Sequence, residues 1–149
     1  MTEISFYHLT RQPLNKALPR LLEKVLAAGH RAVVLAGSDE RVEDLDAALW
    51  TYDPDSFLPH GTRILGHAER QPIYLTTEEE NPNNATVLVL VDGAEPSFIG
   101  SFTRCLDMFD GNSEVAVEAA RERWKRWKAE GFELTYWQQT ETGGWTRKA

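Results

Sequence analysis

The stretch from Thr86 to Val91, Thr-Val-Leu-Val-Leu-Val, places apolar side chains on both faces of an extended chain. A strand of this kind is typical of the centre of a parallel sheet, where helices cover each side. A similar run, Val33-Val34-Leu35, lies within Arg31–Ala36 and predicts a second buried strand. These two segments favour an α/β fold, because parallel strands need helical crossovers to connect them.

Segments with helical spacing alternate with segments typical of strands along the rest of the chain. Pro13 suits the first turn of a leucine-rich helix, and Pro19 either kinks that helix or marks its true start. Ser38 or Asp39 can cap a second helix that runs to about Trp50. The expected strands are Ile4–Leu9, Arg31–Ala36, Ile73–Leu75, Thr86–Val91 and Phe132–Gln138, and the expected helices run from Pro13 to Gly29, from Ser38 to Trp50, over Ser97–Phe109 and over Ser113–Glu130.

This alternation predicts a single-domain, three-layer, Rossmann-like α/β fold with a mostly parallel sheet over residues 1–149. Loops are expected at Thr51–Gly61, which contains two prolines, and at Glu78–Ala85, which is rich in glutamate and asparagine. The Gly143-Gly144 pair predicts a flexible tail over residues 140–149.

Composition excludes several classes of protein. The 149 residues carry a net charge of −7, which argues against a general DNA-coating protein because such proteins depend on Lys and Arg. The single cysteine, Cys105, cannot form an internal disulfide, and we expect it to be a buried apolar residue in the helix predicted at Ser97–Phe109. The acidic start of the chain is unlike a signal peptide, and no apolar run could span a membrane. We therefore expect a cytoplasmic protein with no membrane partner.

Motifs for phosphate binding are missing from the sequence. Neither GxGxxG nor GxxxxGK followed by Ser or Thr occurs in the chain. Gly37-Ser38 could offer backbone amides to an anion, but a turn glycine followed by a helix cap is the favoured interpretation. We therefore expect no nucleotide cofactor.

Three carboxylates leave open an alternative function as a metal-dependent nucleic-acid hydrolase. Asp53 and Asp55 lie in a predicted loop and Asp92 ends a predicted strand, which are places where hydrolytic metal sites are often built. Asp-Pro-Asp is also ordinary turn chemistry, and the spacing of His60 and His67 matches no zinc motif. We therefore expect no metal and assign no catalytic residue.

The predicted helix at Ser113–Glu130 is strongly basic in its second half. Between Arg121 and Lys128 there are five cations against one acid, a net charge of +4 in a chain of −7, so the rest of the chain carries −11. The five cations are Arg121, Arg123, Lys125, Arg126 and Lys128. Such asymmetry indicates either a solvated surface or a partner.

Helical geometry separates this segment into an apolar stripe and a basic flank. The stripe contains Val117, Ala120, Trp124 and Trp127, and the flank beside it contains Arg121, Lys125 and Lys128. Cations beside an aromatic ring suit an acidic peptide with an apolar anchor. Two other interpretations remain: a surface helix with core tryptophans, and a direct binder of single-stranded DNA that stacks bases on Trp124 and Trp127.

Two segments resemble the chi subunit family of bacterial DNA polymerase III. Leu45–Gly61, LDAALWTYDPDSFLPHG, is similar to the family's Leu-Trp … Ser-Phe-x-Pro-His segment. Ala120–Phe132, ARERWKRWKAEGF, is similar to its Ala-Arg-Glu-Arg-aromatic-Lys … Gly-Phe helix, and the opening Phe6-Tyr7-His8-Leu9 resembles its first strand. The three segments keep their order and spread over most of the chain.

The resemblance implies a non-catalytic accessory subunit of the replicative polymerase, within its clamp-loader assembly and without cofactors. The family docks the acidic C-terminal tail of single-stranded DNA-binding protein, and contacts DNA only weakly or indirectly. The positions that match its tail-binding helix are Arg121, Trp124, Lys125 and Lys128. We expect the apolar end of the tail to pack against Trp124, together with Phe109 or Trp50.

The resemblance also implies a second partner surface. In some members the small psi subunit docks near the Ser-Phe-x-Pro-His segment, where Phe57 is the matching aromatic residue. The alternative is that Trp50, Phe57 and Leu58 hold the loop against the body of the protein. We favour this alternative slightly for Trp50, and both remain open for Phe57.

Overall fold

The computed structural model describes residues 2–64 and 66–149, which form an eight-stranded sheet with the order β3-β4-β2-β5-β6-β1-β7-β8. The first seven strands in chain order run parallel, and β8 pairs antiparallel to β7. The strands are β1 (Glu3–Leu9), β2 (Ala32–Leu35), β3 (His60–Thr62), β4 (Ile73–Thr76), β5 (Val87–Leu90), β6 (Arg104–Asp110), β7 (Glu133–Gln139) and β8 (Trp145–Arg147). The α-helices are α1 (Leu14–Ala27), α2 (Asp39–Thr51) and α3 (Glu114–Ala129), and short 3-10 turns cover Ala68–Arg70 and Ile99–Ser101.

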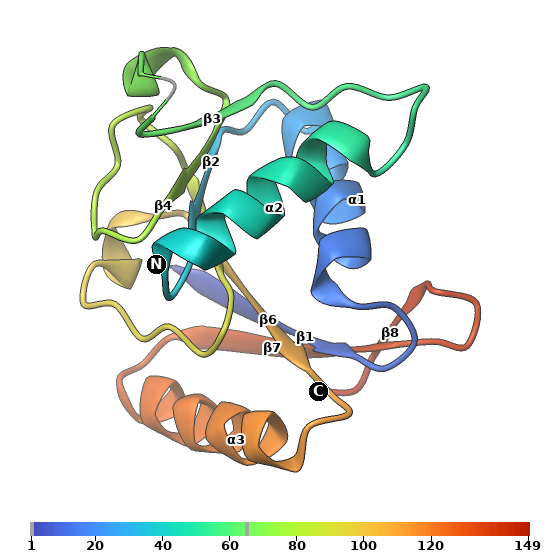
Figure 1. Cartoon of the computed structure of the whole chain (residues 1–149). Helices are drawn as coiled ribbons and strands as arrows, with labels where there is room; N and C mark the ends of the chain where they lie inside the picture. Colours follow the sequence, from blue (N-terminus) through green and yellow to red (C-terminus); the bar gives the residue numbers. More distant parts are fainter. Residues whose placement is uncertain (1, 65) are drawn as a thin grey trace.

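Helices cover both faces of the sheet, which confirms the predicted three-layer Rossmann-like fold. Figure 1 shows α1 and α2 on one face and α3 alone on the other. Each layer has its own apolar core, because β2 and β5 are buried on both faces as their continuous apolar runs predict. No helix in the described part of the chain has the length and apolar character needed to cross a bilayer.

The first two helices begin where the sequence predicts. Pro13 precedes the first residue of α1, so Pro19 lies inside the helix and does not mark its start. Ser38 is the cap of α2, and its side-chain oxygen accepts a hydrogen bond of 3.1 Å from the backbone N–H of Arg41. This bond satisfies one of the free N–H groups of the first helical turn.

The prediction of a helix over Ser97–Phe109 is wrong. A short 3-10 turn is followed by β6, which lies between β5 and β1 and is parallel to both. Cys105 is fully buried as predicted, but in this strand. A short apolar run suits a buried strand as well as a helix, and here the pairing with two neighbouring strands decides the conformation.

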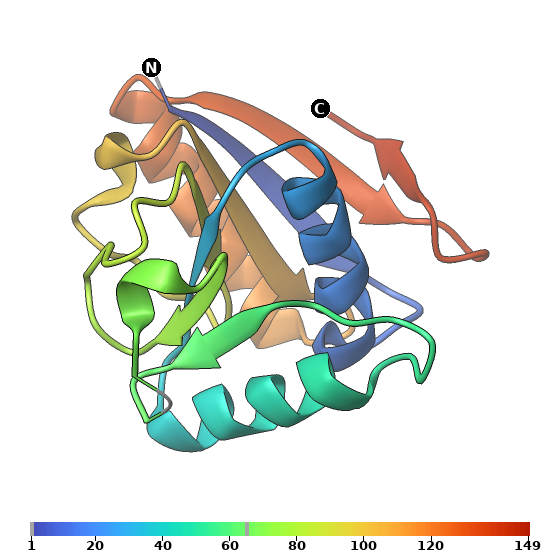
Figure 2. The same ribbon diagram turned by 90° about the horizontal axis from the view of Figure 1, so that it is seen from above.

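The predicted flexible tail differs from the structure. Figure 2 shows β8 folded back beside the end of β7 to form a hairpin at the edge of the sheet. The turn passes through Gly143 at a φ of 88°, a conformation that glycine adopts without strain. The ring of Trp145 then packs edge-on against Tyr7, with 4.9 Å between the ring centroids. The hairpin therefore covers part of the α1 face of the sheet.

Candidate partner-binding site on helix α3

The basic helix predicted from the sequence is α3, which lies across β6, β1 and β7. Ser113 caps it by accepting a hydrogen bond of 3.2 Å from the backbone N–H of Ala116. Ala120 and Trp127 are buried against the sheet, with 2% and 5% of their surfaces exposed. Because Trp127 is buried, it is not available to stack on a base as the DNA-binding interpretation requires.

Two of the five cations of α3 are paired with acidic residues outside the helix. Arg123 is buried, and its Nε and Nη2 atoms donate to the two carboxylate oxygens of Asp107 at 2.8 and 3.0 Å. Burial raises the pKa of Asp107, and the hydrogen bonds from Arg123 oppose that rise. Arg126 forms an exposed ion pair with Glu95. These two arginines belong to the core and to the β5 side of the helix, so they do not extend the basic flank.

The other three cations, Arg121, Lys125 and Lys128, form an exposed row that we call the basic flank. Lys125 lies 3.6 Å from Glu122 in an exposed pair one turn away, which is a weak interaction in water. Arg121 and Lys128 make no ion pair with any residue that the structure describes. The basic flank is therefore open to negatively charged groups from outside the protein.

Trp124 stands half-buried beside the basic flank, on top of an aromatic cluster. Its ring centroid is 5.4 Å from that of Phe6 and 6.0 Å from that of Tyr136. Phe109, predicted to contact the partner, is 5% exposed and lies beneath His8 and Tyr136. It supports the rings above it, and Trp124 and Tyr136 carry the exposed aromatic surface.

A polar pair, His8 and Tyr136, adjoins this aromatic surface. This pair was not identified from the sequence. The Nδ1 atom of His8 lies 2.5 Å from the hydroxyl oxygen of Tyr136, and both side chains are half-buried. Burial lowers the pKa of His8, and the nearby charge of Arg121 lowers it further. Burial raises the pKa of Tyr136, which Arg121 opposes. The alternation of side chains along a strand predicts that Phe6 and His8 lie on the same face of the sheet. It does not predict which helix covers that face.

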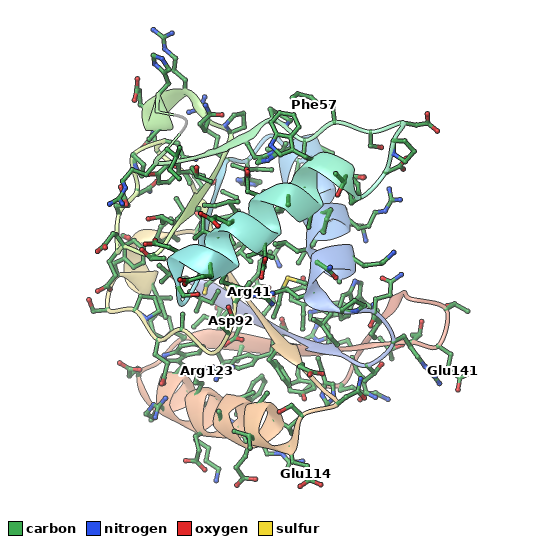
Figure 3. All side chains as sticks on the ribbon, viewed as in Figure 1. Arg41, Phe57, Asp92, Glu114, Arg123 and Glu141 are labelled. Atoms are coloured by element: carbon green, nitrogen blue, oxygen red, sulfur yellow. The ribbon has the colours of Figure 1, made fainter. Side chains whose placement is uncertain are left out.

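Trp50, in the last turn of α2, and Phe57, in the loop that follows, form a second exposed surface. Their exposed fractions are 53% and 67%, and their ring centroids are 5.7 Å apart. The ring centroid of Trp50 also lies 4.8 Å from that of buried His60, so Trp50 packs against the loop while half of its surface stays exposed, and buried Leu58 anchors the loop in the core. Figure 3 shows Phe57 at the top of the molecule and α3 at the bottom, so the two surfaces are well separated.

The three carboxylates of the hydrolase alternative are not brought together. Asp53 pairs with Arg20 at 3.3 Å and accepts the backbone N–H of Asp55 at 2.9 Å, as turn chemistry predicts. Asp92 pairs with Arg41 at 3.0 Å, at the other end of α2, whose 13 residues span roughly 20 Å. Within the residues that the structure describes, no three His, Cys, Asp or Glu side chains are grouped to hold a metal ion.

A cleft of about 780 Å³ lies at the carboxyl ends of β5, β6 and β1, where Rossmann-like folds bind their ligands. Three charged residues on its walls, Arg41, Asp92 and Arg123, are labelled in Figure 3 between α2 and α3. The two arginines are held by Asp92 and Asp107, so neither guanidinium group is free to bind an anion in the cleft.

Comparison with known proteins identifies the family. The sequence model described as "DNA polymerase III chi subunit, HolC" matches residues 1–135. The probable DNA polymerase III subunit chi of Rickettsia prowazekii is 40% identical over 91 residues, which cover 61% of this chain and 55% of that protein. The DNA polymerase III subunits chi of Haemophilus influenzae and Escherichia coli are 24% and 25% identical, over 87% and 72% of this chain and 92% and 73% of their own lengths. The chain belongs to the DNA polymerase III chi subunit family.

Proposed function

We propose that this protein is a non-catalytic accessory subunit of the DNA polymerase III holoenzyme in the bacterial cytoplasm. It links the clamp-loader assembly to single-stranded DNA-binding protein by docking the acidic C-terminal tail of that protein on α3. Membership of the chi family supports the place in the polymerase complex. The observation that carries the docking site is the division of the α3 cations, which leaves Arg121, Lys125 and Lys128 in one exposed row beside Trp124.

The chemistry of the basic flank suits such a tail. Charge-assisted hydrogen bonds from Arg and Lys to carboxylates are stronger than neutral ones, and Trp124 gives the apolar end of the tail a surface to pack against. Ordering a flexible tail opposes binding, so a dissociation constant of about 1 μM is expected. The net charge of −7 disfavours single-stranded DNA as the direct partner, and leaves DNA contact weak or indirect.

Fluorescence anisotropy of a labelled tail peptide, titrated with the full-length protein, tests this proposal. We expect saturable binding that is lost with a peptide lacking the final apolar residues. Arg121→Glu or Lys125→Glu should weaken binding at least about tenfold, since each substitution places a negative charge on the docking surface. Circular dichroism melting should show that both variants remain folded.

Arg126→Glu is the matched control, because it makes the same charge change on the opposite side of the same helix. It should weaken binding much less than Arg121→Glu. Equal losses would show that general charge, and not the basic flank, attracts the tail. No binding of the unmodified protein at about 100 μM would overturn the docking proposal.

The exposed rings of Trp50 and Phe57 favour a second partner of the psi type. Two adjacent large aromatic side chains in water are an unusual feature of a free surface, and such pairs often anchor an interface. Phe57→Ala should abolish co-elution with a psi subunit from the same organism while leaving the tail affinity unchanged. Co-elution that survives both Phe57→Ala and Trp50→Ala would contradict this assignment.

A further inference from the structure

We propose that Tyr136 and His8 extend the docking site and bind the terminal carboxylate of the tail, with uptake of one proton by His8. This inference rests on the proposed function. The two residues adjoin the basic flank through Arg121, whose charge acts on both of them. None of the functional interpretations of the sequence used them.

The position of His8 is fixed from two sides. Tyr136 lies on the neighbouring strand β7, with its hydroxyl oxygen 2.5 Å from Nδ1 of the His8 ring. On the other side the ring packs against the backbone of Gly111, where a side-chain Cβ would fall 2.1 Å from Nε2. Burial lowers the pKa of His8, and the polar backbone of Gly111 beside the ring opposes that effect. Only glycine at position 111 leaves room for this ring.

The protonation state of His8 decides what the Tyr136 hydroxyl can offer. When the neutral ring carries its proton on Nε2, beside Gly111, Nδ1 accepts the Tyr136 O–H and the hydroxyl oxygen has only lone pairs to offer a ligand. In the protonated ring Nδ1–H donates to the hydroxyl oxygen. The O–H is then free to donate to an incoming carboxylate. No covalent bond other than N–H is made, and the proton comes from solvent.

The charges around His8 couple this change to an anionic ligand. Arg121 from α3 lowers the pKa of His8, while Asp110 at the end of β6 and the Gly111 backbone raise it, and burial has the largest effect and lowers it. A carboxylate bound beside Arg121 adds negative charge near the ring, which favours the protonated form. Binding and proton uptake therefore strengthen each other, and affinity should increase as the pH falls below the ordinary histidine pKa of about 6.5.

The aromatic rings next to the polar pair favour binding of the terminal residue of the tail over binding of an acidic side chain within it. Trp124 and Tyr136 lie 6.0 Å apart between centroids and are both half-buried. A terminal residue with an apolar side chain carries its own carboxylate a few bonds away. One such residue can place its side chain on Trp124 and its carboxylate at Tyr136 and Arg121. An acidic side chain within the tail lacks the apolar group.

Isothermal titration calorimetry of the full-length protein with the tail peptide tests this inference. Runs at about pH 8 and pH 6, each in two buffers of different ionisation enthalpy, measure the affinity and the number of protons taken up. We expect affinity to increase at least about threefold at the lower pH, with uptake of a measurable fraction of one proton per peptide. A peptide with an amidated C-terminus should bind more weakly and lose the pH dependence.

Substitutions separate His8 from other titrating groups. His8→Gln and Tyr136→Phe should each lose the gain in affinity between pH 8 and pH 6. His30→Gln is the control, because His30 contacts Thr86 at the opposite end of the parallel strands and should keep the full pH dependence. Melting curves at each pH confirm that the variants remain folded.

The outcomes distinguish this inference from the function on which it rests. Tail binding that is independent of pH in the unmodified protein overturns the role of His8 and leaves the docking site in place. An amidated peptide that binds as well as the free acid, with the same pH dependence, overturns the terminal-carboxylate assignment. Absence of binding at both pH values overturns the docking site itself.

Discussion

Arg123 belongs to a buried ion pair, although it looks like a surface cation in the sequence. By sequence it is one of five cations on a basic helix, but its side chain is 2% exposed and its guanidinium group is held by Asp107. Asp107 lies in β6, 16 positions earlier in the chain, in the strand that was predicted as a helix. The partner of Arg123 could not be identified without the position of that strand.

We expect Arg123→Met to destabilise the protein by about 3–5 kcal/mol, because it leaves the buried Asp107 carboxylate unpaired. Arg126→Met, which breaks the exposed pair with Glu95, should cost less than about 1 kcal/mol. Urea unfolding followed by tryptophan fluorescence measures both. Similar losses in the two variants would mean that the Asp107 pair contributes no more than a surface contact.

His8 should make the stability of the free protein depend on pH. Its pKa is lower in the folded than in the unfolded chain, mainly because of burial, so the folded state favours the neutral ring. Its contribution is fully present above about pH 6.5 and is lost as the pH falls toward the folded pKa. We therefore expect the difference in unfolding free energy between the unmodified protein and His8→Gln to shift against the unmodified protein between about pH 7 and pH 5. A constant difference over this range would contradict the lowered pKa.

At the scale of elements, the connection between β1 and α1 is held by one side chain. The amide oxygen of Gln139, at the end of β7, accepts backbone N–H bonds from Thr10, Arg11 and Gln12 at 3.3, 2.9 and 2.9 Å. Gln139 is 4% exposed, so these three donors share a buried acceptor. The turn that leads from the first strand to the first helix therefore depends on the last parallel strand.

We expect Gln139→Ala to destabilise the protein by about 1–2 kcal/mol, since three part-buried backbone N–H groups would lose their shared acceptor. Hydrogen exchange at the amides of Arg11 and Gln12 should accelerate most. Gln138→Ala is the control, because its side chain makes no hydrogen bond among the described residues and strand alternation turns it to the other face. Equal exchange rates in the two variants would rule out this role for Gln139.

The elements that sequence patterns predicted well are those whose burial is regular along the chain. The runs of β2 and β5 and the caps Ser38 and Ser113 give local signals of their conformation. The segment of β6 gives no such signal, because every position of Cys105-Leu106-Asp107-Met108-Phe109 is buried. The segment therefore shows neither the alternation of a half-buried strand nor the spacing of an amphipathic helix. Strand β3 is three residues long and was included in a predicted loop.

At the scale of the whole molecule, the charge distribution governs the approach of a partner. The positions of Trp124 and the basic flank could be predicted, because helical geometry alone sets them. The sequence could not predict which cations are free, because their partners Asp107 and Glu95 come from β6 and from the loop after β5. The outcome is a short positive row on a surface that is otherwise strongly negative.

This distribution predicts how tail affinity depends on salt. Affinity should fall as salt increases above about 0.1 M, because the contacts are exposed and screened. Below that concentration the Debye length exceeds about 10 Å, so the acidic remainder of the surface also repels the tail. We therefore expect the affinity to level off at low salt in an anisotropy titration series. A continuous linear increase in log affinity toward about 0.01 M would contradict this expectation.

The C-terminal hairpin has a consequence for self-association. An unpaired strand at the edge of a sheet offers a row of N–H and C=O groups on which another chain can add, which is a route to fibres. Strand β8 covers the outer edge of β7 from Trp137 to Gln139. Its short length, with the basic residues Arg147 at its end and Lys148 directly after it, makes it a poor template itself. A chain that ends after Gln139 should therefore form aggregates detectable by light scattering at concentrations where the 149-residue chain stays dispersed.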